Sequence, residues 1–145
     1  MLAVSSGGGH WVQLLRLRPA YQDQDIAFAT VNSDYQQDVT QHRFFLINDA
    51  TRWDKMALLI LAFRLLFIFI RFRPQVVIST GAACGYFAIR LGKLFGATTI
   101  WVDSIANVEE MSLTGQLVGR HADLWLTQWP ELAQPQGPYF HGGVL

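Results

Sequence analysis

The chain has a single cysteine, Cys84, among 145 residues. It can form no intrachain disulfide and offers no cysteine pair to zinc, so we expect it to function in a reducing cytoplasm. Its four histidines, His10, His42, His121 and His141, are scattered along the chain and lack the paired spacing of metal ligands. The sequence therefore predicts no metal site, and we expect no cofactor.

Charge is also scarce. Only 15% of the residues are charged, well under the usual quarter, and 11 basic residues balance 11 acidic ones. This balance lacks the basic footprint of a general nucleic-acid binder, so no nucleic-acid partner is expected. Hydrophobic residues make up 51% of the chain. We therefore expect part of the apolar surface to contact something other than water. The first residues do not form a secretory signal.

Three common catalytic signatures are absent. No turn carries the Lys-Ser/Thr pair of a P-loop, and G-x-S-x-G does not occur, which argues against ATP hydrolysis and serine-esterase chemistry. The dinucleotide pattern G-x-G-x-x-G fits Gly7 and Gly9 but has Val12 at its third position. No clear acidic residue closes the second strand before Asn32. A nucleotide-binding oxidoreductase is thus a disfavoured alternative.

Short apolar runs alternate with helical patterns along the chain. The runs are at 1–4, 26–31, 44–47, 76–79, 99–102 and 124–127, and the helical patterns are at 11–17, 56–70, 86–95 and 111–118. Strands without polar alternation, separated by helices, indicate a parallel sheet that is covered on both faces. We predict a single Rossmann-like domain over 1–145, an α/β fold with a doubly wound, mostly parallel sheet. Residues 130–138 are predicted to form a loop.

The first strand leads directly into a glycine turn, Ser5-Ser6-Gly7-Gly8-Gly9-His10. Between a strand and a helix, such a turn presents unpaired backbone N–H groups and the positive end of the helix dipole. This arrangement suits an anion, with His10 at its edge as a group able to accept a proton. The glycines could instead serve only to tighten the turn.

A second turn of small residues, 79–85, follows the fourth strand and contains Thr80, Gly81, Ala82 and Ala83. In open parallel sheets, ligands bind beyond the carboxyl ends of the strands where the connections diverge. The first and fourth strands flank such a point, so the two turns can face one crevice. Alternatively, the glycines of this turn only allow close packing of a helix on the sheet.

Polar residues also follow the fifth strand: Asp103, Ser104, Asn107 and Glu109. Carboxylate and amide groups suit a ligand rich in hydroxyls, so these residues are candidates for contacts to a sugar. The alternative is local capping. Asp103 or Ser104 could begin a turn, and Asn107 could cap a helix entered through Glu109 and Glu110.

The segment 56–70 is apolar nearly all the way round and is interrupted only by Arg64. It is shorter than the roughly twenty residues of a membrane-spanning helix. Its flanks, 52–55 and 71–74, carry basic and aromatic residues of the kind found at lipid headgroups. We expect a docking helix at about 55–73 that contacts either a membrane surface, through Met56–Ile70, or a partner subunit.

Taken together, these stretches resemble the acceptor-side, membrane-associated subunit of the two-component UDP-N-acetylglucosamine transferases, in the branch that serves bacterial polysaccharide biosynthesis. The matching pieces are SSGGGH at 5–10, HRF at 42–44 with 49–55, STGAA at 79–83, IWVDSIANVE at 100–109, 122–124 through 128–130, and 137–139 with 142–145. The resemblance extends over nearly the whole chain. The second loop departs from the family's single-chain relative, because Cys84 follows the two alanines. The resemblance gives the eukaryotic subunit an N-terminal membrane anchor, which we do not expect here, so membrane attachment is expected to be peripheral at most.

The resemblance implies the N-terminal half of a GT-B glycosyltransferase. Ser6, Gly7, Gly8, Gly9, Thr80, Gly81, Ala82 and Ala83 would then contact the acceptor diphosphate, and His10 would be the catalytic base. A separate subunit, equivalent to the C-terminal half, would bind UDP-GlcNAc.

The function implied is transfer of GlcNAc to a polyprenyl-diphosphate saccharide in exopolysaccharide or lipopolysaccharide assembly. The protein would lie on the cytoplasmic face of the cell membrane as a peripheral subunit, active only with its partner. The alternative is a non-catalytic recruiter that brings a catalytic partner to the membrane.

Overall fold

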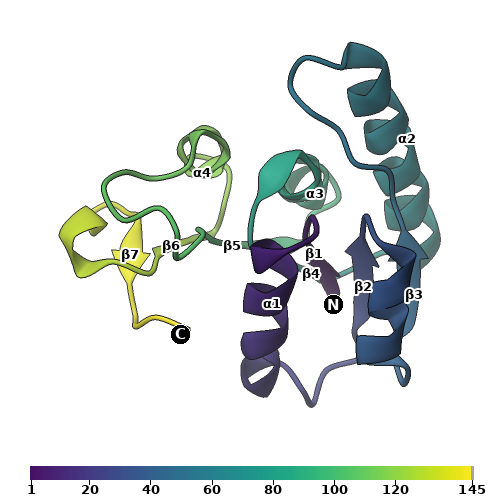
Figure 1. Ribbon diagram of the computed structural model, residues 1–145, viewed down its shortest axis with the longest axis horizontal. Helices are drawn as coiled ribbons and strands as arrows, with labels where there is room; N and C mark the ends of the chain where they lie inside the picture. Colours follow the sequence, from purple (N-terminus) through teal and green to yellow (C-terminus); the bar gives the residue numbers. More distant parts are fainter. Residues whose placement is uncertain (145) are drawn as a thin grey trace.

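A computed structural model describes residues 1–144, so the last residue of the 142–145 motif, Leu145, lies outside the described part. Seven strands form one sheet in the order β3-β2-β1-β4-β5-β6-β7, and all neighbouring pairs are parallel (Figure 1). The strands are β1 (Leu2–Val4), β2 (Ala27–Thr30), β3 (Arg43–Leu46), β4 (Val76–Ser79), β5 (Thr98–Val102), β6 (Leu124–Thr127) and β7 (Tyr139–Phe140).

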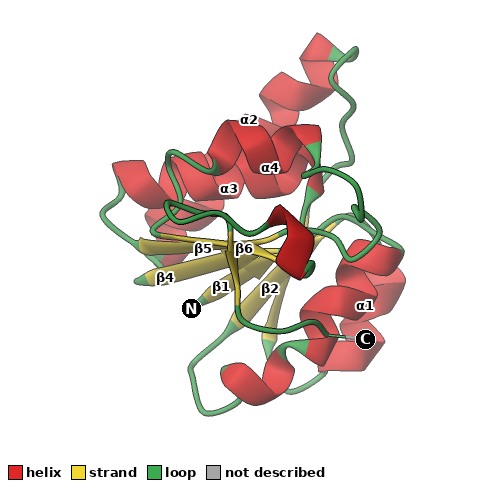
Figure 2. Ribbon diagram, turned by 90° about the vertical axis from the view of Figure 1, so that its left-hand side faces the viewer, coloured by secondary structure: helices red, strands yellow, loops and turns green. Residues whose placement is uncertain are grey.

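Four α-helices cover the sheet. They are α1 (Gly9–Arg16), α2 (Lys55–Phe72), α3 (Ala82–Leu94) and α4 (Leu113–Val118), with 3-10 turns at Arg18–Ala20, Ser33–Val39 and Pro130–Leu132. Figure 2 shows α2, α3 and α4 on one face of the sheet and α1 on the other. Each face has its own core, one built around Leu65, Phe69 and Trp101 and the other around Trp11 and Phe28. The doubly wound α/β fold predicted from the sequence is therefore confirmed.

The strand order reverses beside β1. Leu2 pairs with Ala27 of β2 on one side and with Val77 of β4 on the other. Because parallel strands end at the same edge of the sheet, the segments that follow β1 and β4 leave from adjacent points. The structure thus places the two small-residue turns side by side.

Interactions between neighbouring residues define both ends of the long helix α2. The Asp54 carboxylate accepts a hydrogen bond from the Ala57 amide (2.9 Å), which caps the first turn. At the other end, Arg73 has a left-handed backbone (φ 48°), and Pro74 prevents continuation. Only one stripe of the helix, Leu61, Leu65, Ile68 and Phe69, is buried. Much of its apolar surface therefore faces outward.

Two local expectations differ from the structure. A short strand, β7, follows the predicted loop at 130–138 and pairs Tyr139 with Leu126 of β6. With only two residues, β7 is too short to give a strand pattern in the sequence. It is a strand because it pairs with β6. Helix α4 begins at Leu113 and is capped by the Ser112 hydroxyl, which accepts from the Gly115 amide (2.9 Å). The alternative that Asn107 caps a helix entered through Glu109 is therefore wrong.

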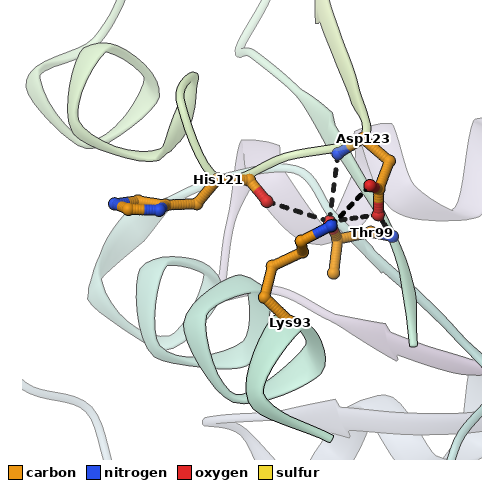
Figure 3. A network of polar contacts seen from close by, with 4 residues as sticks. All are labelled: Lys93, Thr99, His121 and Asp123. Atoms are coloured by element: carbon orange, nitrogen blue, oxygen red, sulfur yellow. Dashed lines mark hydrogen bonds and ion pairs between the residues drawn. The ribbon is translucent and has the colours of Figure 1, made fainter. Parts of the chain in front are cut away.

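A polar network joins α3 to the amino-terminal ends of β5 and β6 (Figure 3). Asp123 forms an ion pair with Lys93 (2.5 Å) and accepts hydrogen bonds from the amide (2.8 Å) and hydroxyl (3.0 Å) of Thr99. The Lys93 hydrogen bond lowers the pKa of Asp123 below its usual value. The backbone carbonyl of His121 belongs to the same network, and its ring contacts Arg90. This cluster lies at the opposite edge of the sheet from the glycine loops and ties strands to a helix.

Candidate functional site

Two hydrogen bonds join the glycine loop after β1 to the loop after β4. The His10 ring donates through Nδ1 to the Thr80 carbonyl oxygen (2.8 Å), and the Thr80 hydroxyl donates to the His10 carbonyl oxygen (2.7 Å). Thr80 is fully buried. The two loops, 70 residues apart in sequence, therefore form a single site.

The first of these bonds assigns the tautomer of His10. A carbonyl oxygen can only accept a hydrogen bond, so the proton of the neutral ring must be on Nδ1. Nε2 then carries a lone pair, and it has no hydrogen-bond partner within residues 1–144. The side chain is partly exposed. In its neutral form His10 therefore has an Nε2 lone pair without a partner in the described part of the chain.

Gly81 makes room for this ring. A β-carbon built at residue 81 would lie 2.4 Å from His10 Cε1 and 2.5 Å from Nδ1, far inside contact distance. Its φ of 146° also suits glycine alone. Ala82 follows with a positive φ of 65°, rare for alanine, and starts α3. The structure thus explains Gly81 by its contact with His10. Gly85 has the alternative role, because a β-carbon there would lie 2.1 Å from Ser79 Oγ of β4 and 3.0 Å from the Trp101 ring of β5.

The first glycine loop is open to solvent. Gly8 and Gly9 are exposed, and β-carbons built on either would meet nothing within 4 Å. The Gly8 N–H donates to the hydroxyl oxygen of Tyr35 (2.9 Å), whereas the N–H groups of the first turn of α1 lie beyond the reach of intrahelical acceptors. The two loops, Ser6 to Gly9 and Thr80 to Ala83, are thus brought together around His10. Thr80 and Gly81 are buried, and the Thr80 hydroxyl and carbonyl are both bonded to His10, so we no longer expect the Thr80 side chain to contact a diphosphate.

The loop after β5 gives Asp103 a different role from the expected one. Asp103 is 1% exposed, and its carboxylate accepts four hydrogen bonds, from Trp101 Nε1, Asn107 Nδ2 and the amide and hydroxyl of Ser112. No carboxylate oxygen is left for a ligand hydroxyl, so Asp103 holds the loop and we no longer expect it to contact a sugar. Ser104 begins a turn, its hydroxyl accepting from the Ala106 amide (3.3 Å). Glu109 is exposed.

Two residues that sequence reasoning missed connect these loops. Gln13 of α1 is 4% exposed, donates to the Asp103 carbonyl (3.0 Å) and accepts from the Ile105 amide (3.2 Å). It joins the helix of the first loop to the loop after β5. Its only signal in the sequence is a glutamine among apolar residues. Tyr35, which binds Gly8, lies in a 3-10 turn expected only as a polar loop and gave no signal.

An apolar hollow of about 550 Å³ lies between the edge strand β3 and α2. Its lining comprises Phe44, Phe45, Leu46, Ile60, Phe63, Arg64, Phe67 and Ile68. On the same helix, Leu59 is 52%, Phe63 62% and Phe67 68% exposed. We call the exposed side chains of Leu59, Ile60, Phe63, Phe67 and Ile70 the outer α2 face. None of the helices within residues 1–144 has both the length and the apolar character needed to cross a membrane.

Comparison with solved structures identifies the fold. The MurG crystal structure from Acinetobacter baumannii superimposes with a TM-score of 0.74 and 12% sequence identity, covering 98% of this chain and 45% of MurG. A UDP-GlcNAc 2-epimerase from Methanocaldococcus jannaschii gives a TM-score of 0.61 at 8% identity, covering 87% of this chain and 38% of the epimerase. At these identities the likeness shows the fold alone, with this chain matching less than half of each protein.

Comparison of sequences identifies the family. The chain is 34% identical over 79 residues to the UDP-N-acetylglucosamine transferase subunit ALG14 of the yeast Yarrowia lipolytica, an alignment that covers 50% of this chain and 37% of the yeast protein. The model of the family described as "Oligosaccharide biosynthesis protein Alg14 like" matches residues 51–144, which include α2, the second small-residue loop and the loop after β5. With about two thirds of its length matched by that model, the chain belongs to the Alg14-like family.

Proposed function

We propose that the chain is the acceptor-binding subunit of a UDP-GlcNAc-dependent glycosyltransferase, and that its acceptor is a saccharide on a polyprenyl diphosphate. The family and the name of the yeast relative support the donor and the subunit role. The lipid diphosphate is supported by the first turns of α1 and α3, which begin after adjacent strands at one edge of the sheet and whose N–H groups lack intrahelical acceptors.

The main observation behind the proposal is the pair of hydrogen bonds that join His10 and Thr80. This pairing leaves Nε2 without a hydrogen-bond partner in the described part of the chain and beside both loops, where an acceptor hydroxyl next to the diphosphate would approach. In the proposed reaction His10 removes the proton of that hydroxyl as the hydroxyl oxygen attacks the sugar carbon of the donor. The loop N–H groups keep the acceptor diphosphate in place, which orients the hydroxyl for attack.

A partner subunit would supply the donor site. This chain aligns over 98% of its length with 45% of MurG, so the rest of a MurG-sized fold lies outside the aligned region. We propose that this part is a separate polypeptide equivalent to the C-terminal half of the fold and that it binds UDP-GlcNAc.

The test is UDP release by the purified complex with a lipid-linked acceptor. We expect His10→Ala to lower the rate by about a hundredfold or more, as loss of a general base typically does. The matched control is His141→Ala, because His141 is exposed near the carboxyl terminus. An unchanged rate in His10→Ala would remove the base from the proposal. Full turnover by this chain without a partner would overturn the division into two subunits.

A second candidate function is recruitment without catalysis, and the outer α2 face favours it. Its residues lie exposed on a helix whose buried stripe already packs on the sheet. Basic residues flank it, Arg52 and Lys55 before and Arg71 and Arg73 after, and within residues 1–144 none of them forms an ion pair. Such a surface suits peripheral docking to anionic lipid. This alternative predicts full activity in His10→Ala and loss of membrane or partner binding in Phe63→Asp.

The cellular setting is a narrower part of the proposal. Peripheral attachment to the cytoplasmic face of a membrane fits the outer α2 face, and the same face could instead contact a partner. The resemblance implied the bacterial branch of the family, but the match to the Yarrowia lipolytica subunit indicates the eukaryotic branch instead.

A further inference from the structure

Tyr35 is held rigidly beside the first glycine loop. Its ring stacks on Trp11 with a centroid distance of 4.9 Å and an interplanar angle of 3°. Trp11 is 2% exposed, and its indole nitrogen donates to Asp38 (2.8 Å) in the same 3-10 turn as Tyr35. The tyrosine ring therefore cannot move without disturbing α1, so the position of its hydroxyl is well determined.

The hydroxyl of Tyr35 makes one hydrogen bond in the described part of the chain and can make a second one as a donor. Its oxygen accepts from the Gly8 N–H (2.9 Å), and a β-carbon built on Gly7 would lie 3.4 Å from the same atom. Accepting that bond leaves the hydroxyl proton free, and the proton has no acceptor within residues 1–144. A hydroxyl that accepts a hydrogen bond becomes a better donor, because the bonds polarise each other. The side chain is partly exposed next to the open glycines.

We propose that Tyr35 is a ligand-binding residue that donates its hydroxyl proton to a phosphate oxygen of the acceptor. The glycine loop beside it, residues 5–10, offers backbone N–H donors and contains no acidic residue, and Oδ2 of the nearby Asp38 accepts from Trp11. A cluster of donors selects an oxyanion over a neutral hydroxyl ligand. The inference rests on the proposed function, because it adds a side-chain donor to the diphosphate loop assigned there.

The probe is inorganic pyrophosphate, titrated calorimetrically into the complex of the full chain and its partner. Tyr35→Phe keeps the stacked ring and removes only the hydroxyl. We expect its Kd for pyrophosphate to rise about tenfold, the effect of losing one hydrogen bond to a charged group. In the transfer reaction the same variant should raise the KM for the lipid-linked acceptor by a similar factor and change kcat less than twofold.

Tyr21→Phe is the matched control. The Tyr21 hydroxyl also bonds to backbone near α1, donating to the Leu14 carbonyl (2.5 Å), but it is buried in the core. Both variants lose one hydroxyl bond, so thermal unfolding should report similar stability losses, whereas only Tyr35→Phe should weaken pyrophosphate binding. Equal weakening in both variants, or unchanged binding in Tyr35→Phe, would overturn the proposal.

The outcomes separate this inference from the proposed function. If the wild-type complex binds pyrophosphate and Tyr35→Phe binds it equally well, the role of Tyr35 is wrong and the glycine loops remain the diphosphate site. If the wild type does not bind pyrophosphate, the diphosphate loop and the Tyr35 donor both fail. If binding depends on Tyr35 but no sugar transfer occurs with a lipid-linked acceptor, the anion site stands and the proposed reaction is wrong.

Discussion

The imidazole of His10 and the backbone and hydroxyl of Thr80 hold each other through two hydrogen bonds of 2.8 Å and 2.7 Å. In each bond the side chain of one residue donates to the backbone carbonyl of the other. Neither loop can therefore shift relative to the other without breaking both bonds. Because the Thr80 carbonyl can only accept, the pairing also sets which ring nitrogen carries the proton. The geometry of two loops and the protonation of one side chain are thus determined together.

Thr80→Val tests the half of this pairing that depends on the threonine hydroxyl. Valine keeps the buried shape and removes the donor to His10, which should cost about 1 kcal/mol of unfolding free energy. If the same loss appears in the transition state, kcat falls about fivefold. Thr30→Val is the control, since Thr30 is equally buried and its hydroxyl makes only a long contact with Ser6 (3.4 Å). Denaturant unfolding and UDP release measure the two effects, and equal behaviour of the two variants would contradict the assignment.

Gly81→Ala should displace the His10 ring. The new methyl group would lie 2.4 Å from it, so we expect a loss of about 2 kcal/mol or more in stability and near-complete loss of transfer. Gly96→Ala separates this clash from backbone strain. Gly96 also has a positive φ, 75°, but a β-carbon there meets nothing within 4 Å, so about 1 kcal/mol and no loss of activity are expected. An active Gly81→Ala enzyme would show that the observed position of His10 is not required.

Phe63→Asp tests the outer α2 face. Phe63 is 62% exposed, so the substitution should leave the fold intact while it removes an apolar contact of about 2 kcal/mol and lowers vesicle binding at least tenfold. Cosedimentation with vesicles containing anionic lipid measures the effect. Leu94→Asp, at a residue 78% exposed at the end of α3, should bind as the wild type does. If Phe63→Asp binds vesicles normally but loses its partner, the face contacts protein instead.

Asp123 makes the stability depend on acid pH. Its pKa is lowered in the folded protein, chiefly by the Lys93 hydrogen bond, so its contribution is present above the unfolded value of 3.8 and is lost as pH falls through the folded value. Since the pair is 44% and 39% exposed, the contribution should be below about 1 kcal/mol. We therefore expect the Tm of Asp123→Asn to be lower than that of the wild type at pH 7, and the two Tm values to converge as the pH falls below 3.8. Asp23→Asn is the control, because Asp23 is an exposed loop residue, and its Tm at pH 7 should equal that of the wild type.

Local patterns in the sequence were enough to predict the main elements. The apolar run at β1 is buried along its whole length, as expected for a central parallel strand. Helix α2 extends from the Asp54 cap to the residue before Arg73, close to the predicted 55–73. The glycine turns could be placed at one edge of the sheet because parallel strands all end there. Each of these conclusions depends on residues that are neighbours in the chain.

The parts that sequence reasoning could not supply are contacts between distant residues. The short strand β7 forms by pairing with β6. The Asp103 carboxylate is occupied by hydrogen bonds from residues up to nine positions away, which leaves it no free oxygen for a ligand. Gly8 meets Tyr35 across 27 residues. None of these contacts leaves a periodic signal, because each depends on how a turn or helix packs on the sheet.

The sequence by itself determined a doubly wound sheet with two loops of small residues at one edge and an apolar helix. Tertiary structure alone decided the hydrogen bonding of the side chains in and near these loops: His10 with Nε2 free, Tyr35 with an unused proton, and Asp103 fully bonded. The reason is physical, since strand and helix formation follow local propensity and periodicity. The hydrogen-bonding state of a side chain depends instead on every group that packing brings within about 3 Å of it.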